Sequence, residues 1–204
     1  MRARRFSTHL AAPFGLVARL ILIVVFSGAT FNAQSVPIIP AWIHAGLVVT
    51  YDSVSAFVNQ GRFSQGVRVL MTTRVTAVSK GAVSGITQMQ TVGTPLGGRH
   101  AWTCNAMGAC QGDQTGFTGK FWVDPDHPTD SVRGPNGEPY RLIGRGPYAY
   151  GGRTWSGVML SYQNPSTGFQ YDLTFDAKSG LVLAYSETSP GQQVHVYFRA
   201  MSGR

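Results

Sequence analysis

A short Gly-rich segment places Tyr148, Tyr150, Arg153 and Trp155 close together along the chain. Aromatic rings stack on the faces of sugars, and an Arg guanidinium beside such rings can bind a polar headgroup. We therefore treat these four residues as candidate ligand contacts. The alternative interpretation is a loop whose aromatic side chains fold back over the mouth of a barrel.

Trp122 is a fifth candidate ligand contact. The chain has four Trp, at 42, 102, 122 and 155, and several segments with large apolar residues on one face. A curved sheet that does not close tightly leaves an apolar cavity of the kind that holds a small ligand. A tightly filled core gives the same sequence pattern, so the two interpretations stay open at this point.

The densest group of possible metal ligands is Asp124, Asp126 and Asp130 with His127. The three Asp stand at positions one, three and seven of a calcium-type loop, but the twelfth position, where a bidentate Glu belongs, is Pro135. Asp and Pro are also the residues expected in a turn that leaves a strand. The pattern favours a turn, and no metal site is assigned.

Motifs that would identify an enzyme are missing from the sequence. It contains no G-x-S-x-G, no H-E-x-x-H, no P-loop and no G-x-G-x-x-G. His44, His100 and His195 stand in separate segments, where a structural or surface role is the usual one. No catalytic residue and no cofactor is assigned, which favours a non-catalytic protein.

The two cysteines, Cys104 and Cys110, are close in sequence. In an oxidising compartment such a pair usually forms a disulfide. A zinc site would recruit His100, but the resulting spacing is unlike the common short Cys knuckle. We expect a disulfide that pins a loop at about residues 93–120.

The first 29 residues have the pattern of a signal peptide. Four Arg precede or interrupt an apolar run at residues 20–26, and small residues at 27–29 fit a cleavage site. A membrane-spanning anchor would need about 20 consecutive apolar residues, and Arg19 leaves a shorter run. We expect a periplasmic or secreted protein without a stable membrane anchor, with residues 30–204 forming a single β-rich domain.

The charge of the remaining chain does not favour nucleic acid. Cleavage after residue 29 would leave thirteen basic and nine acidic residues, a net charge of +4. The Arg and Lys are scattered singly, whereas a nucleic-acid-binding surface shows a basic cluster. We exclude nucleic acid as a partner.

Period-two alternation predicts the elements that position these residues. It is strict at residues 169–176 and resumes at 181–187 and 194–199 after turn residues, which predicts three consecutive antiparallel strands. Further strands are expected at residues 46–51, 67–78, 83–92 and 154–163. The predicted fold class is all-β, an antiparallel β-meander that forms an open or half β-barrel.

Three segments are expected to depart from this pattern. Residues 53–60 have Ser53 as a possible N-cap and could form two turns of helix, a minor α element. Residues 93–120 and 124–152 are rich in Gly and Pro, and we expect both to be long irregular connections.

Residues 169–187, FQYDLTFDAKSGLVLAYSE, resemble the late hairpin of bacterial periplasmic lipoprotein carriers of the LolA type and their LppX-like relatives. The resemblance implies an open half-barrel that holds acyl chains. Export and the meander of long strands also resemble that group, and the likeness covers about a quarter of the chain after residue 29. The plugging helices of that family have only residues 53–60 as a counterpart, and the loop between the two cysteines is foreign to it, so no functional residue is carried over.

Together these features predict an exported, non-catalytic binding protein for an apolar ligand or lipid. One alternative is a secreted or envelope protein-interaction or inhibitor module that uses the loop between Cys104 and Cys110 to contact an envelope protein. A second alternative is a hydrolase whose His, Asp and Ser converge from distant segments.

Overall fold

The computed structural model describes residues 37–59, 62–107, 109–112, 121–134 and 137–203. These residues belong to a compact unit, 35–204. The predicted signal peptide lies outside the described residues, so both it and the domain boundary at residue 30 stay predictions.

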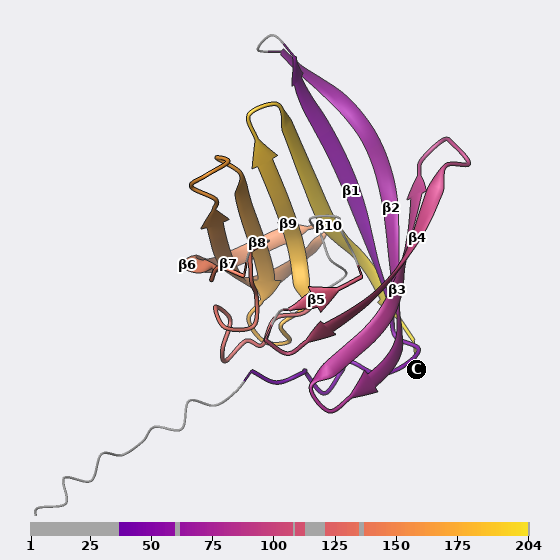
Figure 1. Ribbon diagram of the computed structural model, residues 1–204, viewed down its shortest axis with the longest axis vertical. Helices are drawn as coiled ribbons and strands as arrows, with labels where there is room; N and C mark the ends of the chain where they lie inside the picture. Colours follow the sequence, from indigo (N-terminus) through magenta and orange to yellow (C-terminus); the bar gives the residue numbers. More distant parts are fainter. Residues whose placement is uncertain (1–36, 60–61, 108, 113–120, 135–136, 204) are drawn as a thin grey trace, which may run out of the picture. The chain divides into compact units, whose positions relative to one another are not determined.

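One antiparallel sheet contains every named strand of the described residues (Figure 1). The order across it is β5-β4-β3-β2-β1-β10-β9-β8-β7-β6, so it begins and ends on edge strands and is not closed. The described residues form no helix, and hence none that could cross a membrane. The predicted all-β open half-barrel is confirmed. Its ten strands are β1 (Val48–Asn59), β2 (Arg62–Ser79), β3 (Ala82–Thr91), β4 (Gly97–Asn105), β5 (Cys110–Gln111), β6 (Arg141–Tyr150), β7 (Arg153–Gln163), β8 (Gln170–Asp176), β9 (Val182–Ser189) and β10 (Gln192–Ser202).

The strands predicted from alternation are present, and the short helix predicted at residues 53–60 is wrong. Residues 53–59 are the second half of β1, where Ser53 pairs with Val69 of β2 on one side and with Val196 of β10 on the other, and residue 60 lies outside the described residues. Backbone pairing on both sides outweighs the weak helix propensity of a segment that contains Val54 and Phe57. The minor α element is therefore absent from the described part of the chain.

The two segments expected to be irregular also contain strands. Residues 93–120 include β4 and β5, and residues 124–152 include β6. Gly97 shows why Gly is compatible with a strand here, because a Cβ at this position would lie 2.6 Å from the carbonyl oxygen of Met89 in β3. At Gly97, glycine therefore marks close backbone approach rather than the absence of regular structure.

The predicted disulfide is confirmed, with an S–S distance of 2.02 Å between Cys104 and Cys110. The two cysteines stand opposite each other in the β4–β5 ladder. The turn between them is held by a bond from the Asn105 amide to the Ala109 carbonyl oxygen at 2.9 Å. The side-chain oxygen of Asn105 accepts from the Ala109 amide at 3.0 Å.

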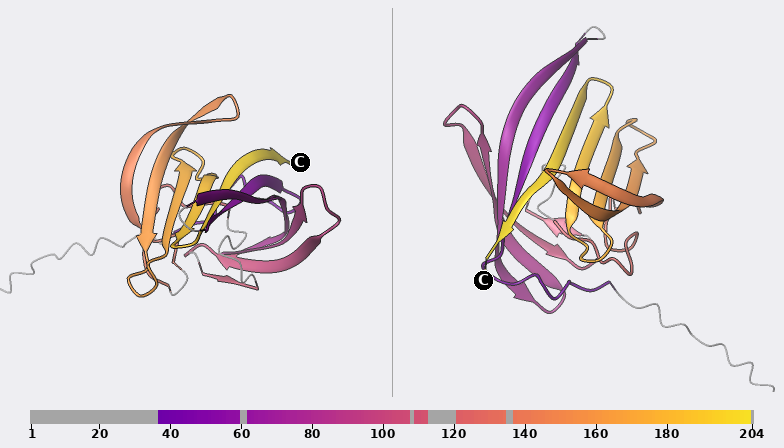
Figure 2. Two further views of the ribbon diagram at one scale, coloured as in Figure 1. Left: turned by 90° about the horizontal axis from the view of Figure 1, so that it is seen from above. Right: turned by 180° about the vertical axis from the view of Figure 1, so that it is seen from behind.

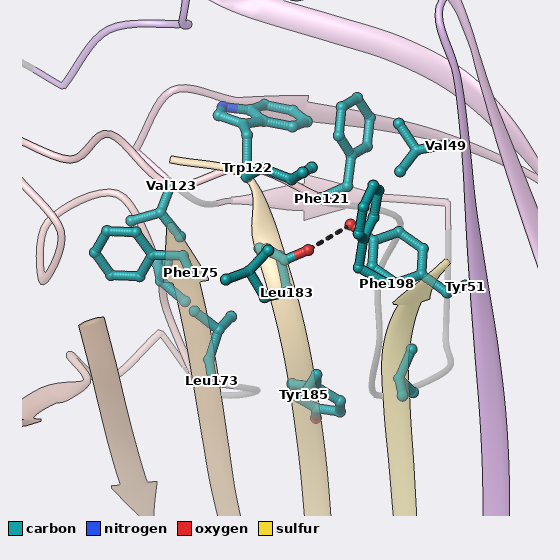
Figure 3. Packing of buried hydrophobic residues seen from close by; sticks show 14 of the residues in the cluster. Val49, Tyr51, Phe121, Trp122, Val123, Leu173, Phe175, Leu183, Tyr185 and Phe198 are labelled. Atoms are coloured by element: carbon teal, nitrogen blue, oxygen red, sulfur yellow. Dashed lines mark hydrogen bonds between the residues drawn. The ribbon is translucent and has the colours of Figure 1, made fainter. Parts of the chain in front are cut away.

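Residues 121–123 cover one end of the inner face of the sheet. The Val123 amide donates to the Gly180 carbonyl oxygen at 2.8 Å, and the Val182 amide donates to the Phe121 carbonyl oxygen at 2.9 Å. Trp122 is fully buried there, with its ring centroid 5.2 Å from that of Phe121. Figure 3 shows both rings packed above Leu183. This end of the half-barrel is filled by the protein's own side chains.

Candidate ligand-binding cleft

The β6–β7 hairpin extends beyond its neighbour in the sheet. The β7–β8 ladder runs from Gly157 to Gln163, and the Ser156 carbonyl oxygen accepts one further bond, from Ala177, at 2.7 Å. Residues 148–155, here called the hairpin tip, pair across the hairpin, Tyr148 with Trp155 and Tyr150 with Arg153. The tip is therefore a two-stranded ribbon that can bend independently of the rest of the sheet.

The tip folds back across the sheet. Figure 2 (right) shows the β6–β7 hairpin crossing the face of β8–β10 opposite the one seen in Figure 1. At the root of the tip, Gly146 and Gly157 stand opposite each other. A Cβ at position 157 would lie 2.9 Å from the Tyr148 Cβ and 3.1 Å from the Gly146 carbonyl oxygen. Glycine at position 157 therefore allows the two strands to come close at the root of the tip.

Strand alternation determines which side chains the tip presents to the sheet. Val158 and Leu160 face the core, so Gly157 and, two residues earlier, Trp155 share the opposite face. On β10, Tyr197 pairs with Ala184 of β9. Ala184 follows core-facing Leu183, so Ala184 and its partner Tyr197 lie on the face opposite the core. The tip therefore lies over a surface that contains Tyr197.

Ring contacts join the tip to β10. Tyr150 stacks on Tyr197 with ring centroids 4.9 Å apart and planes at 14°. Trp155 meets Phe198 edge to face at 6.1 Å, and Tyr148 packs against Trp155 at 6.4 Å. The β9–β10 ladder ends at Tyr197, so Phe198 lies just past the point where these strands separate and can contact Trp155.

Between the tip and strands β1 and β10 lies a cleft of about 450 Å³. Its rings supply apolar surface, and its charged side chains supply hydrogen-bond donors and one carboxylate. The lining residues are Asp52, Tyr150, Gly151, Arg153, Trp155, Phe198 and Arg199.

Asp52 is the acidic group of the cleft, and it is only 8% exposed. Its Oδ1 lies 3.1 Å from Nη2 of Arg68 on β2. Both of its oxygens lie 3.4 Å from Nη1 of Arg199. The carboxylate is thus shared between two guanidinium groups from neighbouring strands.

Two phenols beside the cleft, those of Tyr148 and Tyr197, have raised pKa values and are neutral at physiological pH. Burial raises the pKa of Tyr148 to about 12, and the nearby Tyr197 and Tyr150 add to the rise. Burial and Tyr150 also raise the pKa of Tyr197. These rings therefore act as stacking surfaces and hydrogen-bonding hydroxyls, not as charged groups.

The structure brings together most of the ligand contacts predicted from the sequence. Tyr150, Arg153 and Trp155 line the cleft, and Tyr148, outside the lining, packs against Trp155. Trp122 is not brought to it, because this side chain is fully buried among core rings. The segment is a strand hairpin and not a loop at a barrel mouth.

Sequence reasoning missed the residues that the other strands contribute. Asp52, Phe198 and Arg199 lie about 50 to 100 residues from the tip, in β1 and β10. Alternation alone places Arg199 on a strand face, but it carries no signal that the tip bends onto that face.

The Asp124 segment forms the turn expected from its composition. Asp124 Oδ1 accepts from the Asp126 amide at 3.0 Å, and Oδ2 lies 3.1 Å from Nδ1 of His127. Oδ2 also accepts from the Ile38 amide at 2.8 Å, which ties residues 37–43 to the turn. Among the described residues, no group of three His, Cys, Asp or Glu is placed to hold a metal ion.

No family model matches the chain, and no curated protein matches its sequence. Similar solved structures include a protein from Bacteroides fragilis assigned as exported, with a YmcC-like fold. It is 8% identical with a TM-score of 0.43, and the match covers 78% of this chain and 96% of that one.

Two other similar structures belong to named groups. A LolA superfamily protein from Nitrosomonas europaea is 10% identical with a TM-score of 0.29, covering 79% of this chain and 87% of that one. The similar structures thus include one from the LolA group that the sequence of residues 169–187 resembles. The Pseudomonas aeruginosa MucA/MucB complex is matched at 17% identity with a TM-score of 0.33, over 76% of this chain and about half, 51%, of that one.

Proposed function

We propose that this protein is an exported, non-catalytic binding protein that holds an apolar molecule or the apolar part of a lipid in the cleft at the hairpin tip. One observation carries the proposal: Tyr150, Trp155 and Phe198, from β6, β7 and β10, line a single cleft. Rings from separate strands that meet at a hollow provide a stacking surface with little flexibility of its own.

The size and composition of the cleft suit a small ligand. Its volume of about 450 Å³ lies in the range of roughly 300–1,000 Å³ found for small-molecule sites. Such sites are lined mainly by apolar and aromatic groups, with a few polar groups that orient the ligand. This cleft contains both kinds of group, three rings and three charged side chains, so its polar share is larger than in most such sites.

Periplasmic or secreted location is part of the proposal. It is supported by the predicted signal peptide and by the Cys104–Cys110 disulfide, since disulfides persist in oxidising compartments.

The proposal is tested with the neutral fluorescent probe N-phenyl-1-naphthylamine, whose emission rises in apolar surroundings. Removing a ring removes stacking surface, so we expect Trp155→Ala and Tyr150→Ala each to weaken probe binding about 5-fold or more. Leu142→Ala is the matched control, because Leu142 is an exposed apolar residue of the same hairpin, outside the cleft.

Circular dichroism before titration verifies that each variant keeps the native sheet. Equal probe affinity in the folded Tyr150 and Trp155 variants and in the control would exclude the cleft as the apolar site. Organic-solvent extracts of the protein purified from its native host are analysed in parallel, and an extract without any hydrophobic molecule would count against a stored ligand.

A further inference from the structure

The charges around the cleft do not balance. Arg153 and Arg199 line it together with a single carboxylate, Asp52, which also pairs with Arg68. In the part of the chain that the structure describes, no Asp or Glu forms an ion pair with Arg153. The cleft and its immediate surroundings therefore contain three guanidinium groups and one carboxylate, a net positive charge.

The geometry at Asp52 leaves Arg199 available to a ligand. The contact to Arg68, at 3.1 Å, is the shorter one, whereas Arg199 reaches both carboxylate oxygens at 3.4 Å through Nη1 alone. The Arg199 side chain is 54% exposed. A guanidinium has five N–H donors, so most of those of Arg199 remain for another acceptor.

The positive groups and the rings share one small space. Arg153 follows the turn after Tyr150 and precedes Trp155 by two residues, so it shares the Trp155 face of the strand. An acceptor held by Arg153 would therefore lie beside the aromatic wall. A carboxylate or phosphate forms short, strong, often paired hydrogen bonds with Arg.

We propose that the ligand is a single-headed anionic amphiphile, with its carboxylate or phosphate bound by Arg153 and Arg199 and its apolar part against Tyr150, Trp155 and Phe198. This inference rests on the proposed function and specifies the class of molecule that the cleft selects. Asp52 acts as a positioning residue, since it holds Arg199 toward the cleft and would repel an anion that entered too deeply.

The test compares two ligands of equal chain length, decanoate and decan-1-ol, by isothermal titration calorimetry on the whole protein. We expect decanoate to bind about 10-fold more tightly, the gain typical of a charge-assisted hydrogen bond. Arg153→Met should lower decanoate affinity about 10-fold and leave decan-1-ol affinity within about 2-fold. Arg145→Met removes the same charge from the same hairpin outside the cleft and should change neither.

Dihexanoylphosphatidylglycerol and dihexanoylphosphatidylcholine form a second pair that distinguishes a phospholipid from a free fatty acid as the source of the anion. Arg153-dependent binding of decanoate or of the phosphatidylglycerol supports the inference. Equal binding of decanoate and decan-1-ol, with neither anion affected by Arg153→Met, overturns it while the proposed function stands. If Trp155→Ala changes the affinity for neither decan-1-ol nor N-phenyl-1-naphthylamine, the proposed function itself fails.

Discussion

The carboxylate of Asp124 accepts hydrogen bonds from groups in two distant parts of the chain, the Ile38 amide and the turn residues Asp126 and His127. Burial by itself would raise the pKa of this carboxyl. The bonds from Ile38, His127 and Asp126 outweigh burial, so the pKa of Asp124 lies below its ordinary value of 3.8. The ionised form therefore stabilises the fold.

Replacing Asp124 with Asn should destabilise the protein by about 1–3 kcal/mol at pH 7, because one acceptor becomes an NH₂ group that faces an N–H donor. A lowered folded-state pKa means that the stabilisation is complete above the unfolded pKa and is lost as pH falls through the folded value. Urea unfolding at pH 7 and at about pH 2.5 should show a large difference between the two proteins only at the higher pH. An equal difference at both would mean that ionisation of Asp124 contributes nothing.

At the level of residues, the sequence indicated half of the cleft. Tyr148, Tyr150, Arg153 and Trp155 are conspicuous because they are neighbours in the chain. The other half depends on tertiary contacts, and alternation along β10 cannot reveal which element covers Phe198 or Arg199.

Among the elements, the β8–β9 turn has a sequence that is constrained by a neighbouring segment. Gly180 has a φ of 74°, and a Cβ there would collide with the carbonyl oxygen of Val123. The same turn pairs with residues 121–123, which fill the inner face of the sheet. A side chain at 180 would therefore push this covering segment away.

Gly168 provides a control for Gly180, since its φ of 71° is similar and a Cβ there would meet nothing within 4 Å. Gly168→Ala should cost about 1–2 kcal/mol, the strain of a left-handed residue. Gly180→Ala should cost at least about 2 kcal/mol more, because the clash with backbone adds to the same strain. Denaturant unfolding of both variants checks this, and equal losses would show that the Val123 contact relaxes freely.

Most of the strands follow from alternation, and the errors share one cause. The sequence of β6 is rich in Gly and contains Pro147, and β4 begins with Gly97 and Gly98, so local preference indicated loops. Both are strands because a regular neighbour, β7 or β3, supplies a ladder to pair with. The helix predicted at residues 53–60 is wrong for the same reason, since the local sequence does not show the pairing partners in β2 and β10.

On the scale of the whole molecule, one hydrophobic cluster joins the two halves of the strand order. It includes Val49 of β1, Trp102 of β4, Phe121, Leu160 of β7 and Leu183 of β9. A hydrogen bond from the Tyr51 hydroxyl to the Val182 carbonyl oxygen, at 3.0 Å, also links β1 to β9 (Figure 3). The half-barrel is therefore stabilised as one body despite its open edges.

A continuous core predicts cooperative unfolding. Far-UV circular dichroism, which reports the sheet, and Trp fluorescence, which reports buried Trp102 and Trp122, should give coincident urea transitions. Two separated transitions would show that the sheet splits into independently stable parts.

The curvature that brings the tip onto β10 is the property least visible in the sequence. Period two identifies faces, but it does not reveal the close approach at Gly157 or the ring stack between Tyr150 and Tyr197. Tyr150 is in β6 and Tyr197 is in β10, and three other strands lie between β6 and β10 in the sheet, so only the folded chain brings the two rings together.

The described backbone bonds of the hairpin tip run across its own two strands, and its recorded contacts with β10 are between side chains. The hairpin tip can therefore move away from β10 while the hydrogen bonds of the β6–β7 ladder stay formed. An occupant would then leave through a local motion, at a rate unrelated to that of global unfolding. Residence time in the cleft and lifetime of the native state are thus separately adjustable, the first by the ring at 150 and the second by the core.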